Sequence, residues 1–312
     1  MGELLKGKVA VVTGAGKGLG RAEAVEMAKQ GAKVVVNDLG AASDGSGVSR
    51  GPADEVVAEI KKAGGQAVAS YASVAEVDGA ESIIKTAVDS FGRVDILVNN
   101  AGFNHDRMIY NTTDEEWESV IKVNLSGTFY CTRAACKIMR QQGYGRIINT
   151  SSHAGLGNMG QANYSAAKEG IVGLTRTVAR DMARYGVTCN VIRPVAGTRG
   201  FVEMVKEKGL REAWIKMWGA ELAEKRLKQM LELNQPEDVA GLVVYLASEK
   251  ADNVNGCVFE VWYGHIGIFV DPPPLEQVLK KDGRWTVEEL VEKMPATLTK
   301  NKVHDLPAIF PF

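Results

Sequence analysis

The stretch Lys8-Val-Ala-Val-Val-Thr-Gly-Ala-Gly-Lys-Gly-Leu-Gly20 joins a short β-branched run to a turn that is rich in glycine. The run is typical of a buried strand. A helix-compatible segment follows over 21–30, and Gly31-Ala-Lys-Val-Val-Val-Asn-Asp38 has the pattern of a second strand. This order of elements predicts a βαβ unit of the kind that binds mononucleotides. The glycines at 14, 18 and 20 form a variant of the usual dinucleotide fingerprint.

The glycine turn indicates a site for a pyrophosphate. Gly14, Gly18 and Gly20 let the backbone approach phosphate oxygens. The start of the following helix offers free N–H groups and positive potential. A flexible glycine turn without a ligand is the alternative interpretation.

Asp38 at the end of the second strand indicates which dinucleotide binds. Its carboxylate can accept hydrogen bonds from the ribose hydroxyls, and it repels a 2′-phosphate, so it favours NAD over NADP. Lys17 in the turn is a competing signal, because a cation there favours a phosphate. A loop aspartate that caps a turn before Gly40 is the other explanation of Asp38.

Tyr164 and Lys168 are four residues apart in a helix-compatible segment, so their side chains share one face. A phenol is a poor base at neutral pH, and a nearby ammonium stabilises the phenolate. The pair can therefore move a proton on and off an alcohol. The alternative is a half-buried ring beside a solvated charge.

These features together resemble the short-chain dehydrogenase/reductase family over roughly residues 5–264. The matching motifs are Thr13-Gly-x-x-x-Gly-x-Gly20, Asn99-Asn-Ala-Gly102, Asn124, Ser151, Tyr164-x-x-x-Lys168 and Asn190-Val-Ile-Arg-Pro194. The stretches 36–40, 160–168 and 194–199 are more narrowly similar to the dehydrogenase part of peroxisomal multifunctional β-oxidation enzymes and their bacterial relatives.

The resemblance implies a role for each catalytic position. Tyr164 would be the general acid/base, and Lys168 would lower its pKa and hold the nicotinamide ribose. Ser151, thirteen residues before Tyr164, would hydrogen-bond the substrate oxygen. The residues alone do not choose between Ser151 and Ser152, and the family spacing selects Ser151. Asn124 would hold a helix kink and a water that leads to Lys168.

The resemblance also assigns the cofactor contacts, which come from several loops: Gly14, Lys17, Gly18, Leu19, Gly20, Asp38, Ser73, Val74, Asn100, Ala101, Gly102, Tyr164, Lys168, Pro194 and Thr198. Two alternatives stay open. Ser151 could be a strand-end hydroxyl that the backbone satisfies, and Asn124 could bend a helix without a proton role. Ala72 stands where the family commonly has an aspartate against the adenine ring, so the backbone could make that contact.

The alternation of patterns predicts an α/β fold, a doubly wound parallel sheet (Rossmann fold) in a single domain over 1–265. Seven strands are expected at 8–13, 33–37, 67–71, 94–98, 145–150, 187–192 and 257–262. Helices are expected at 18–30, 53–63, 78–91, 114–139, 162–184 and 236–247. A charged insertion over about 200–234 interrupts the alternation and predicts a helical substrate lid that carries Trp214 and Trp218. A solvated helix pair is the alternative.

Residues 266–312 are expected to form a C-terminal extension. Phe269-Val-Asp-Pro-Pro-Pro274 predicts an extended arm. Thr286 followed by Glu289 predicts a capping box at the start of a short helix. The extension is too small to fold alone, so we expect it to pack on the core or on a neighbouring subunit. Partial disorder is the alternative.

Composition limits the class of protein. The formal net charge of −1 gives no electrostatic case for nucleic acid or membrane partners. The N-terminus lacks an apolar signal core, the last residues are not a peroxisomal tripeptide, and the four cysteines have no C-x-x-C pairing. We therefore expect a cytoplasmic enzyme. The scattered histidines suggest no metal, and His153 either lines the substrate pocket or is an ordinary loop residue.

The expected function is an NAD-dependent oxidoreductase that interconverts a secondary alcohol and a ketone by hydride transfer. A small-molecule substrate is expected, and the narrower resemblance favours a 3-hydroxyacyl-CoA thioester. The alternatives are a hydroxysteroid or alicyclic alcohol dehydrogenase and, from a different class, an NAD-binding scaffold without catalysis. Scaffolds on this fold typically lose the Tyr or the Lys, and both are present here. Family members usually assemble through their two long helices, so a homotetramer or homodimer is expected.

Overall fold

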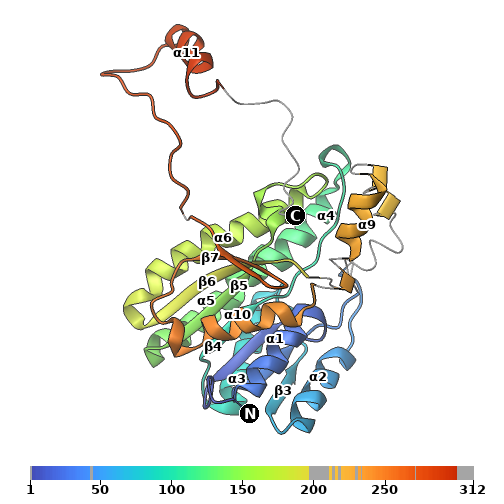
Figure 1. The fold of residues 1–312 in the computed structure, drawn as a ribbon. Helices are drawn as coiled ribbons and strands as arrows, with labels where there is room; N and C mark the ends of the chain where they lie inside the picture. Colours follow the sequence, from blue (N-terminus) through green and yellow to red (C-terminus); the bar gives the residue numbers. More distant parts are fainter. Residues whose placement is uncertain are drawn as a thin grey trace.

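The computed structural model shows one twisted sheet with helices on both faces (Figure 1). It describes residues 2–42, 45–196, 211–212, 215–216, 219–228, 231–232, 234–270 and 272–300. The strand order is β3-β2-β1-β4-β5-β6-β7-β8. The strands are β1 Val9–Thr13, β2 Lys33–Asn37, β3 Gln66–Ser70, β4 Ile96–Asn99, β5 Gly145–Thr150, β6 Val187–Pro194, β7 Val258–Trp262 and β8 His265–Ile268. The predicted doubly wound fold is confirmed.

The sheet forms because its central strands are buried on both faces, as their β-branched runs predict. Every residue of β1 and β5 is buried. One apolar core joins the sheet to α1 Gly18–Lys29, α2 Gly51–Lys62 and α10 Glu237–Ala247. The other core joins it to helices on the opposite face: α3 Val77–Phe91, α5 Gly127–Gln142 and α6 Ala162–Met182.

The last strand departs from the prediction. β8 runs antiparallel to β7, and Phe259 pairs with Ile268. The chain reverses at Tyr263-Gly264, and Gly264 adopts a φ of 66° that favours glycine. Only four residues long, β8 has no apolar face turned to the core, since Ile266 and Ile268 are both 62% exposed. The sequence predicted seven parallel strands. The described sheet contains these seven and also β8, which is antiparallel.

The helix expected over 114–139 is divided. α4 Asp114–Ile121 leads into a π-helical turn at Lys122–Ser126, and α5 follows. α4 begins with a capping box between Thr113 and Glu116. The irregular turn contains Asn124, at the position where the family resemblance placed a kink.

The C-terminal extension begins on the core. Phe269 continues past β8, donates its N–H to Val258 O at 2.9 Å and packs against an apolar cluster that includes Ile171 and Val191. Further on, α11 Val287–Lys293 has the predicted capping box between Thr286 and Glu289. α11 lies apart from the sheet in Figure 1, and Val287 and Val291 are exposed.

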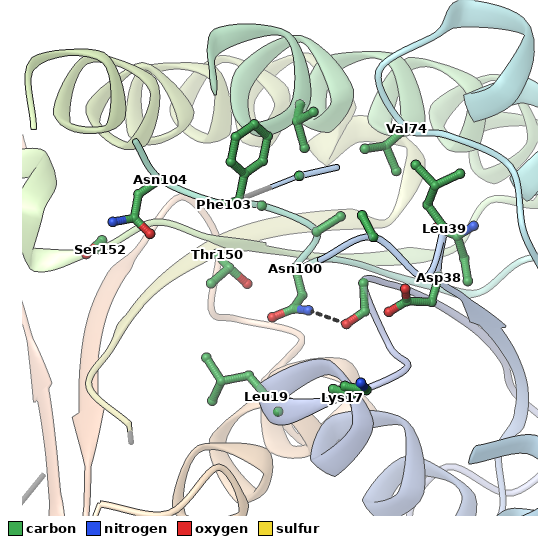
Figure 2. A pocket seen from close by; sticks show the side chains of 18 of the residues that line it. Lys17, Leu19, Asp38, Leu39, Val74, Asn100, Phe103, Asn104, Thr150 and Ser152 are labelled. Atoms are coloured by element: carbon green, nitrogen blue, oxygen red, sulfur yellow. Dashed lines mark hydrogen bonds between the residues drawn. The ribbon is translucent and has the colours of Figure 1, made fainter. Parts of the chain in front are cut away.

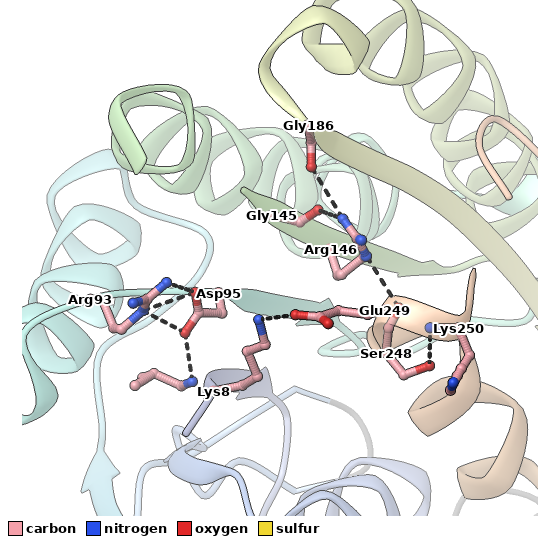
Figure 3. A network of polar contacts seen from close by, with 10 residues as sticks. Lys8, Arg93, Asp95, Gly145, Arg146, Gly186, Ser248, Glu249 and Lys250 are labelled. Carbon is pink, nitrogen blue, oxygen red and sulfur yellow. Dashed lines mark hydrogen bonds and ion pairs between the residues drawn. The ribbon is translucent and has the colours of Figure 1, made fainter. Parts of the chain in front are cut away.

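The amino ends of the strands are closed by a polar network (Figure 3). The buried Asp95 accepts a hydrogen bond from Val9 N at 2.9 Å and two or more from the Arg93 guanidinium. Lys8 pairs with Glu249 at 2.7 Å. These contacts join the starts of β1 and β4 to the end of α10.

Arg146 is the buried centre of the same network. It is 4% exposed and donates to three backbone oxygens, Ser248 O at 3.3 Å, Gly145 O at 2.9 Å and Gly186 O at 3.1 Å. Its role at this end of the sheet is structural, because the carboxyl ends of the strands lie at the opposite edge.

Glu23 is an exception to the apolar packing of α1. It is fully buried, and neither carboxylate oxygen has a hydrogen-bond partner. Burial raises the pKa of Glu23 to about 8, because an ionised carboxylate without a partner is costly in an apolar surrounding. The carboxyl is therefore mostly protonated at neutral pH.

Glu23 should make stability fall as the pH rises. The folded chain keeps the proton up to about pH 8, whereas the unfolded chain releases it near the ordinary pKa of 4.5. The free energy of unfolding should thus fall between these limits by up to about 1.4 kcal/mol per pH unit. Glu23→Gln should flatten this slope in urea titrations from pH 5 to 8, and Glu26→Gln on the same helix should not. Parallel slopes for wild type and Glu23→Gln would contradict this account.

Candidate active site

A cleft of about 410 Å³ opens at the carboxyl ends of β1 and β4, where the strand order reverses (Figure 2). Ligands of doubly wound sheets bind at such a switch point. Most of the positions that the sequence assigned to the site line it: Gly14, Lys17, Gly18, Leu19, Asp38, Ser73, Val74, Asn100, Ala101, Gly102, Ser151, Tyr164, Lys168 and Pro194.

The floor of the cleft requires glycine. Gly14 has a φ of 63°, and a Cβ there would lie 2.8 Å from Ala101 Cα. A Cβ on Gly20 would lie 2.4 Å from Gly14 O. The turn therefore brings the backbone and the N-terminus of α1 to the cleft without side chains between them, which suits an anionic group.

Asp38 is fixed at the end of β2 by two backbone amides. Gly16 N donates to its Oδ2 at 2.7 Å and Gly40 N to its Oδ1 at 2.6 Å. Figure 2 shows the carboxylate and Lys17 on the rim of the same cleft. Each oxygen keeps lone pairs for a further donor, as a ribose diol would supply.

The loops around Asp38 include residues that the sequence did not single out. Asn37, 2% exposed, donates from Nδ2 to Ala72 O at 3.0 Å and to Ser70 O at 3.2 Å. Asn37 thereby holds the backbone at Ala72, the position where the family commonly has an aspartate. The other lining residues that were not predicted are Leu39, Ala41, Ala42, Gly45, Pro52, Phe103, Asn104, Val123, Thr150, Ser152 and Ala196.

Asn100 joins the two loops that meet at the switch point. Its Nδ2 donates to Gly14 O at 3.0 Å (Figure 2). It also donates to Thr13 O at 2.9 Å. The Thr13 hydroxyl accepts hydrogen bonds from Asn100 N and Ala101 N, both at 3.1 Å. Phe103 and Asn104 follow directly in the chain, so an extension of the Asn99–Gly102 motif by two residues would have found them.

Asn124 is buried in the π-helical turn. Its Nδ2 donates to Phe103 O at 2.8 Å and Val120 O at 3.0 Å, and its Oδ1 is buried without a hydrogen-bond partner. A Cβ on Gly102 would lie 2.3 Å from this oxygen and 3.4 Å from Lys168 Nζ. Asn124 is therefore held beside Lys168 with one free acceptor, although it does not line the cleft itself.

Tyr164 and Lys168 lie in the first two turns of α6. Lys168 Nζ donates to Thr150 O at 2.8 Å and lies 5.3 Å from the centre of the Tyr164 ring. Burial lowers the pKa of Lys168 to about 7, since no carboxylate compensates its charge. Burial also raises the pKa of Tyr164 to about 12, and a hydrogen bond with the Ser152 hydroxyl opposes that rise.

The two serines after β5 have different surroundings. Ser151 is 1% exposed, and its Oγ donates to the backbone oxygen of Lys168 at 2.7 Å. The Ser152 hydroxyl, by contrast, lowers the pKa of Tyr164, and both side chains line the cleft. Successive side chains of an extended segment point to opposite sides, so the two neighbouring serines face different groups. Both serines line the cleft, and Ser152 is the one whose hydroxyl acts on Tyr164.

The residues predicted for the substrate are not brought to the cleft by the described part of the chain. His153 lies outside the cleft lining and has its Nε2 3.4 Å from Glu260 Oε2. Burial lowers the pKa of His153. Thr198, Trp214 and Trp218 lie outside the described residues, as does most of the lid expected over 200–234; α9 Ala220–Lys228 is its longest described helix.

Other kinds of site are not found in the described ranges. No three His, Cys, Asp or Glu side chains there are placed to hold a metal ion. No helix among them has the length and apolar character that a membrane span needs.

Comparisons with known proteins agree with this geometry. The family model "short chain dehydrogenase" matches residues 8–209. The peroxisomal multifunctional enzyme type 2 of Drosophila melanogaster is 57% identical over 194 residues, which are 62% of this chain and 32% of that protein. The enzyme of the same name from Mus musculus is 46% identical over 84% of this chain and 32% of its own length. This chain thus spans about a third of these relatives.

Two relatives match nearly from end to end. The hydroxyacyl-CoA dehydrogenase ChsB1 of Mycobacterium tuberculosis is 43% identical over 92% of this chain and 87% of its own. The crystal structure of a short chain dehydrogenase from Mycobacterium avium superposes with a TM-score of 0.79 at 43% identity and covers 98% of both chains. The chain therefore belongs to the short-chain dehydrogenase family.

Proposed function

We propose that this enzyme uses NAD to interconvert a 3-hydroxyacyl-CoA and the corresponding 3-oxoacyl-CoA. The observation that carries the proposal is that Ser152, Tyr164 and Lys168 line the same cleft as the glycine turn, with the Ser152 hydroxyl lowering the pKa of Tyr164. Two hydroxyls at one point can bind a single alcohol or carbonyl oxygen, and the cleft beside them has the features of a dinucleotide site.

The residues present fit NAD. The positions of Gly14 and Gly20 leave no room for a Cβ, so the pyrophosphate can approach the backbone and the N-terminus of α1. Asp38, already held by two amides, would bind the adenosine ribose and repel a 2′-phosphate. Lys17 on the same rim is the residue that works against this preference.

The cofactor supplies the hydride acceptor and donor, and the chain supplies position and a proton. Ser152 donates a hydrogen bond to the substrate oxygen and holds it beside Tyr164. Tyr164 takes the hydroxyl proton during alcohol oxidation and returns it during ketone reduction. The pKa of Tyr164 is raised to about 12 by burial, so a positive charge on Lys168 is needed to stabilise the tyrosinate.

Protons can leave the pair on the side away from the substrate. Asn124 Oδ1 is buried without a partner, next to Gly102 and close to Lys168. We infer that a water there accepts a hydrogen bond from Lys168 and donates one to Asn124. This water would satisfy the buried oxygen and give the Lys168 ammonium a route for its proton.

The substrate class rests on the relatives. A protein named hydroxyacyl-CoA dehydrogenase matches this chain over most of both lengths. The multifunctional relatives are about three times longer, so their further activities are not extended to this chain. Hydroxysteroids and alicyclic alcohols are the competing substrates, and a direct assay distinguishes them.

A homo-oligomer is part of the proposal. Trp117 on α4 and Phe129 on α5 are each 41% exposed, so each of these helices keeps a large apolar side chain in water. A second copy of the chain would cover them. Light scattering measures the assembly directly, and a monomer at micromolar concentration would exclude this part of the proposal.

NADH formation should be fastest with 3-hydroxyacyl-CoA in a panel that also contains hydroxysteroids and alicyclic alcohols. Tyr164→Phe should lower turnover by orders of magnitude and leave the NADH dissociation constant nearly unchanged, because it removes the proton donor and little surface. A faster rate with a steroid would replace the substrate class. Near-normal turnover of the Tyr164→Phe variant would reject the acid/base role.

The two serines should behave differently. Ser152→Ala removes a donor to the developing alkoxide, so kcat should fall by about 10²-fold or more with the KM for NAD unchanged. Ser151→Ala removes a buried hydrogen bond to Lys168 O, so it should cost roughly 1 kcal/mol of stability and leave kcat close to wild type. Kinetics and urea unfolding of both variants decide the matter, and the opposite pattern would restore Ser151.

Asp38→Asn should weaken NAD binding by roughly tenfold, because hydrogen bonds to a charged acceptor are lost. NADP should become a better substrate, because the repulsion of its phosphate is removed. Asp54→Asn is the control, since Asp54 bonds Tyr71 at 2.6 Å and does not line the cleft. Steady-state kinetics with both cofactors test this, and a wild-type preference for NADP would show that Lys17 outweighs Asp38.

A further inference from the structure

A second polar cluster lies behind the Ser152–Tyr164 pair, on the side of β6 to β8. It contains Arg193 from β6, Glu169 from α6, His153 from the turn after Ser152, and Glu260 and His265 from the β7–β8 hairpin. No step of the proposed reaction uses these residues. Five ionisable side chains in one place therefore need another explanation.

Arg193 joins two parts of the active site. Its guanidinium is 3% exposed, donates from Nη2 to Glu169 Oε2 at 2.7 Å, and donates from Nη1 to Ser152 O at 3.4 Å. Its charge lies 5.1 Å from the centre of the Phe269 ring. Glu169 follows Lys168 on α6, so this one side chain links the peptide of Ser152 to the helix that carries Tyr164.

The Glu169 carboxylate lies against the turn that follows Ser152. A Cβ on Gly155 would lie 2.9 Å from Glu169 Oε2, so the short helix η3 His153–Leu156 rests directly on that carboxylate. The Ser152 hydroxyl also accepts a hydrogen bond from Ala154 N at 3.2 Å. The orientation of Ser152 therefore depends on where η3 lies against α6.

The hairpin supports η3 from the other side. Glu260 Oε1 lies 2.8 Å from His265 Nε2, and Glu260 Oε2 lies 3.4 Å from His153 Nε2. The Trp262 ring stacks on His265, with 3.8 Å between ring centres, and meets His153 edge-on at 6.0 Å. These contacts hold the residue that follows Ser152 against the sheet edge.

We propose that Arg193, through Glu169, is a positioning residue that sets the distance between the Ser152 and Tyr164 hydroxyls. The inference rests on the proposed function, because it takes Ser152 and Tyr164 as the groups that bind the substrate oxygen. Loss of the link leaves both hydroxyls in place but lets the Ser152 peptide move relative to α6. A shift of about 1 Å at such a site can lower turnover by about 10²-fold.

Arg193→Met keeps an unbranched apolar stem and removes the guanidinium donors. kcat should fall by about 10²-fold with the best alcohol that wild type oxidises, while the NADH dissociation constant stays near that of wild type. Arg146→Met is a matched control, because Arg146 is equally buried in a strand and also donates to backbone oxygens, at the opposite end of the sheet. It should lower the melting temperature and leave kcat unchanged.

The pH profile separates positioning from stability. Burial and Asp106 raise the pKa of Tyr164, whereas the Ser152 hydroxyl lowers it. Lys168, on the same helix, is a charged group beside the Tyr164 ring. Arg193→Met should thus raise the pKa of Tyr164 and move the rise of kcat/KM for alcohol oxidation to higher pH. Arg146→Met should keep the wild-type midpoint, because it does not touch the Ser152 turn.

Glu169 gives a second test, because its side chain is 45% exposed and tolerates substitution. Glu169→Ala should lower kcat, Glu169→Gln should restore much of it by keeping an acceptor, and Glu169→Ala should add little to Arg193→Met. The proposal is overturned if Arg193→Met or Glu169→Ala keeps wild-type kcat, or if Arg193→Met and Arg146→Met lose it equally. Full activity of Ser152→Ala would overturn the assignment of Ser152 itself, and the positioning role with it.

Discussion

The close approach of two backbones where the strand order reverses is the constraint on which the rest of the site depends. A single hydroxyl, that of Thr13, accepts hydrogen bonds from Asn100 N and Ala101 N, and Asn100 returns two to the glycine turn. The gap that this leaves at Gly14 is too small for a Cβ. The glycine turn and the loop that leads to Asn124 are therefore held together, and both line the cleft.

The stability of the fold and the chemistry of the site make opposite demands on α6. Lys168 is buried without a carboxylate, and its pKa is lowered to about 7. A protein selected for stability alone would place an apolar residue there or supply a counter-charge. A carboxylate beside Lys168 would, however, neutralise the charge that the tyrosinate of Tyr164 needs. The free-energy cost of burying Lys168 is offset by the two large apolar cores that flank the sheet.

Local signals in the sequence were sufficient for most of the fold and part of the site. β-branched runs predicted the parallel strands, the Thr286–Glu289 capping box marked α11, and the spacing of Tyr164 and Lys168 placed both on one face. The remaining features depend on information that is not local. The side of the chain on which Ser151 or Ser152 lies depends on how β5 leaves the sheet, and β8 exists only because β7 offers an edge to pair with.

The π-helical turn at Lys122–Ser126 changes which side chains of the following helix face the sheet. One additional residue in a helical turn rotates everything after it by about 100°. α4 can therefore pack on α6, while α5 turns a different face to α3 and β5. Deletion of one residue would give a regular helix but would rotate Cys131, Ala135 and Met139 out of the core, so the irregularity cannot be lost without repacking one face of the sheet.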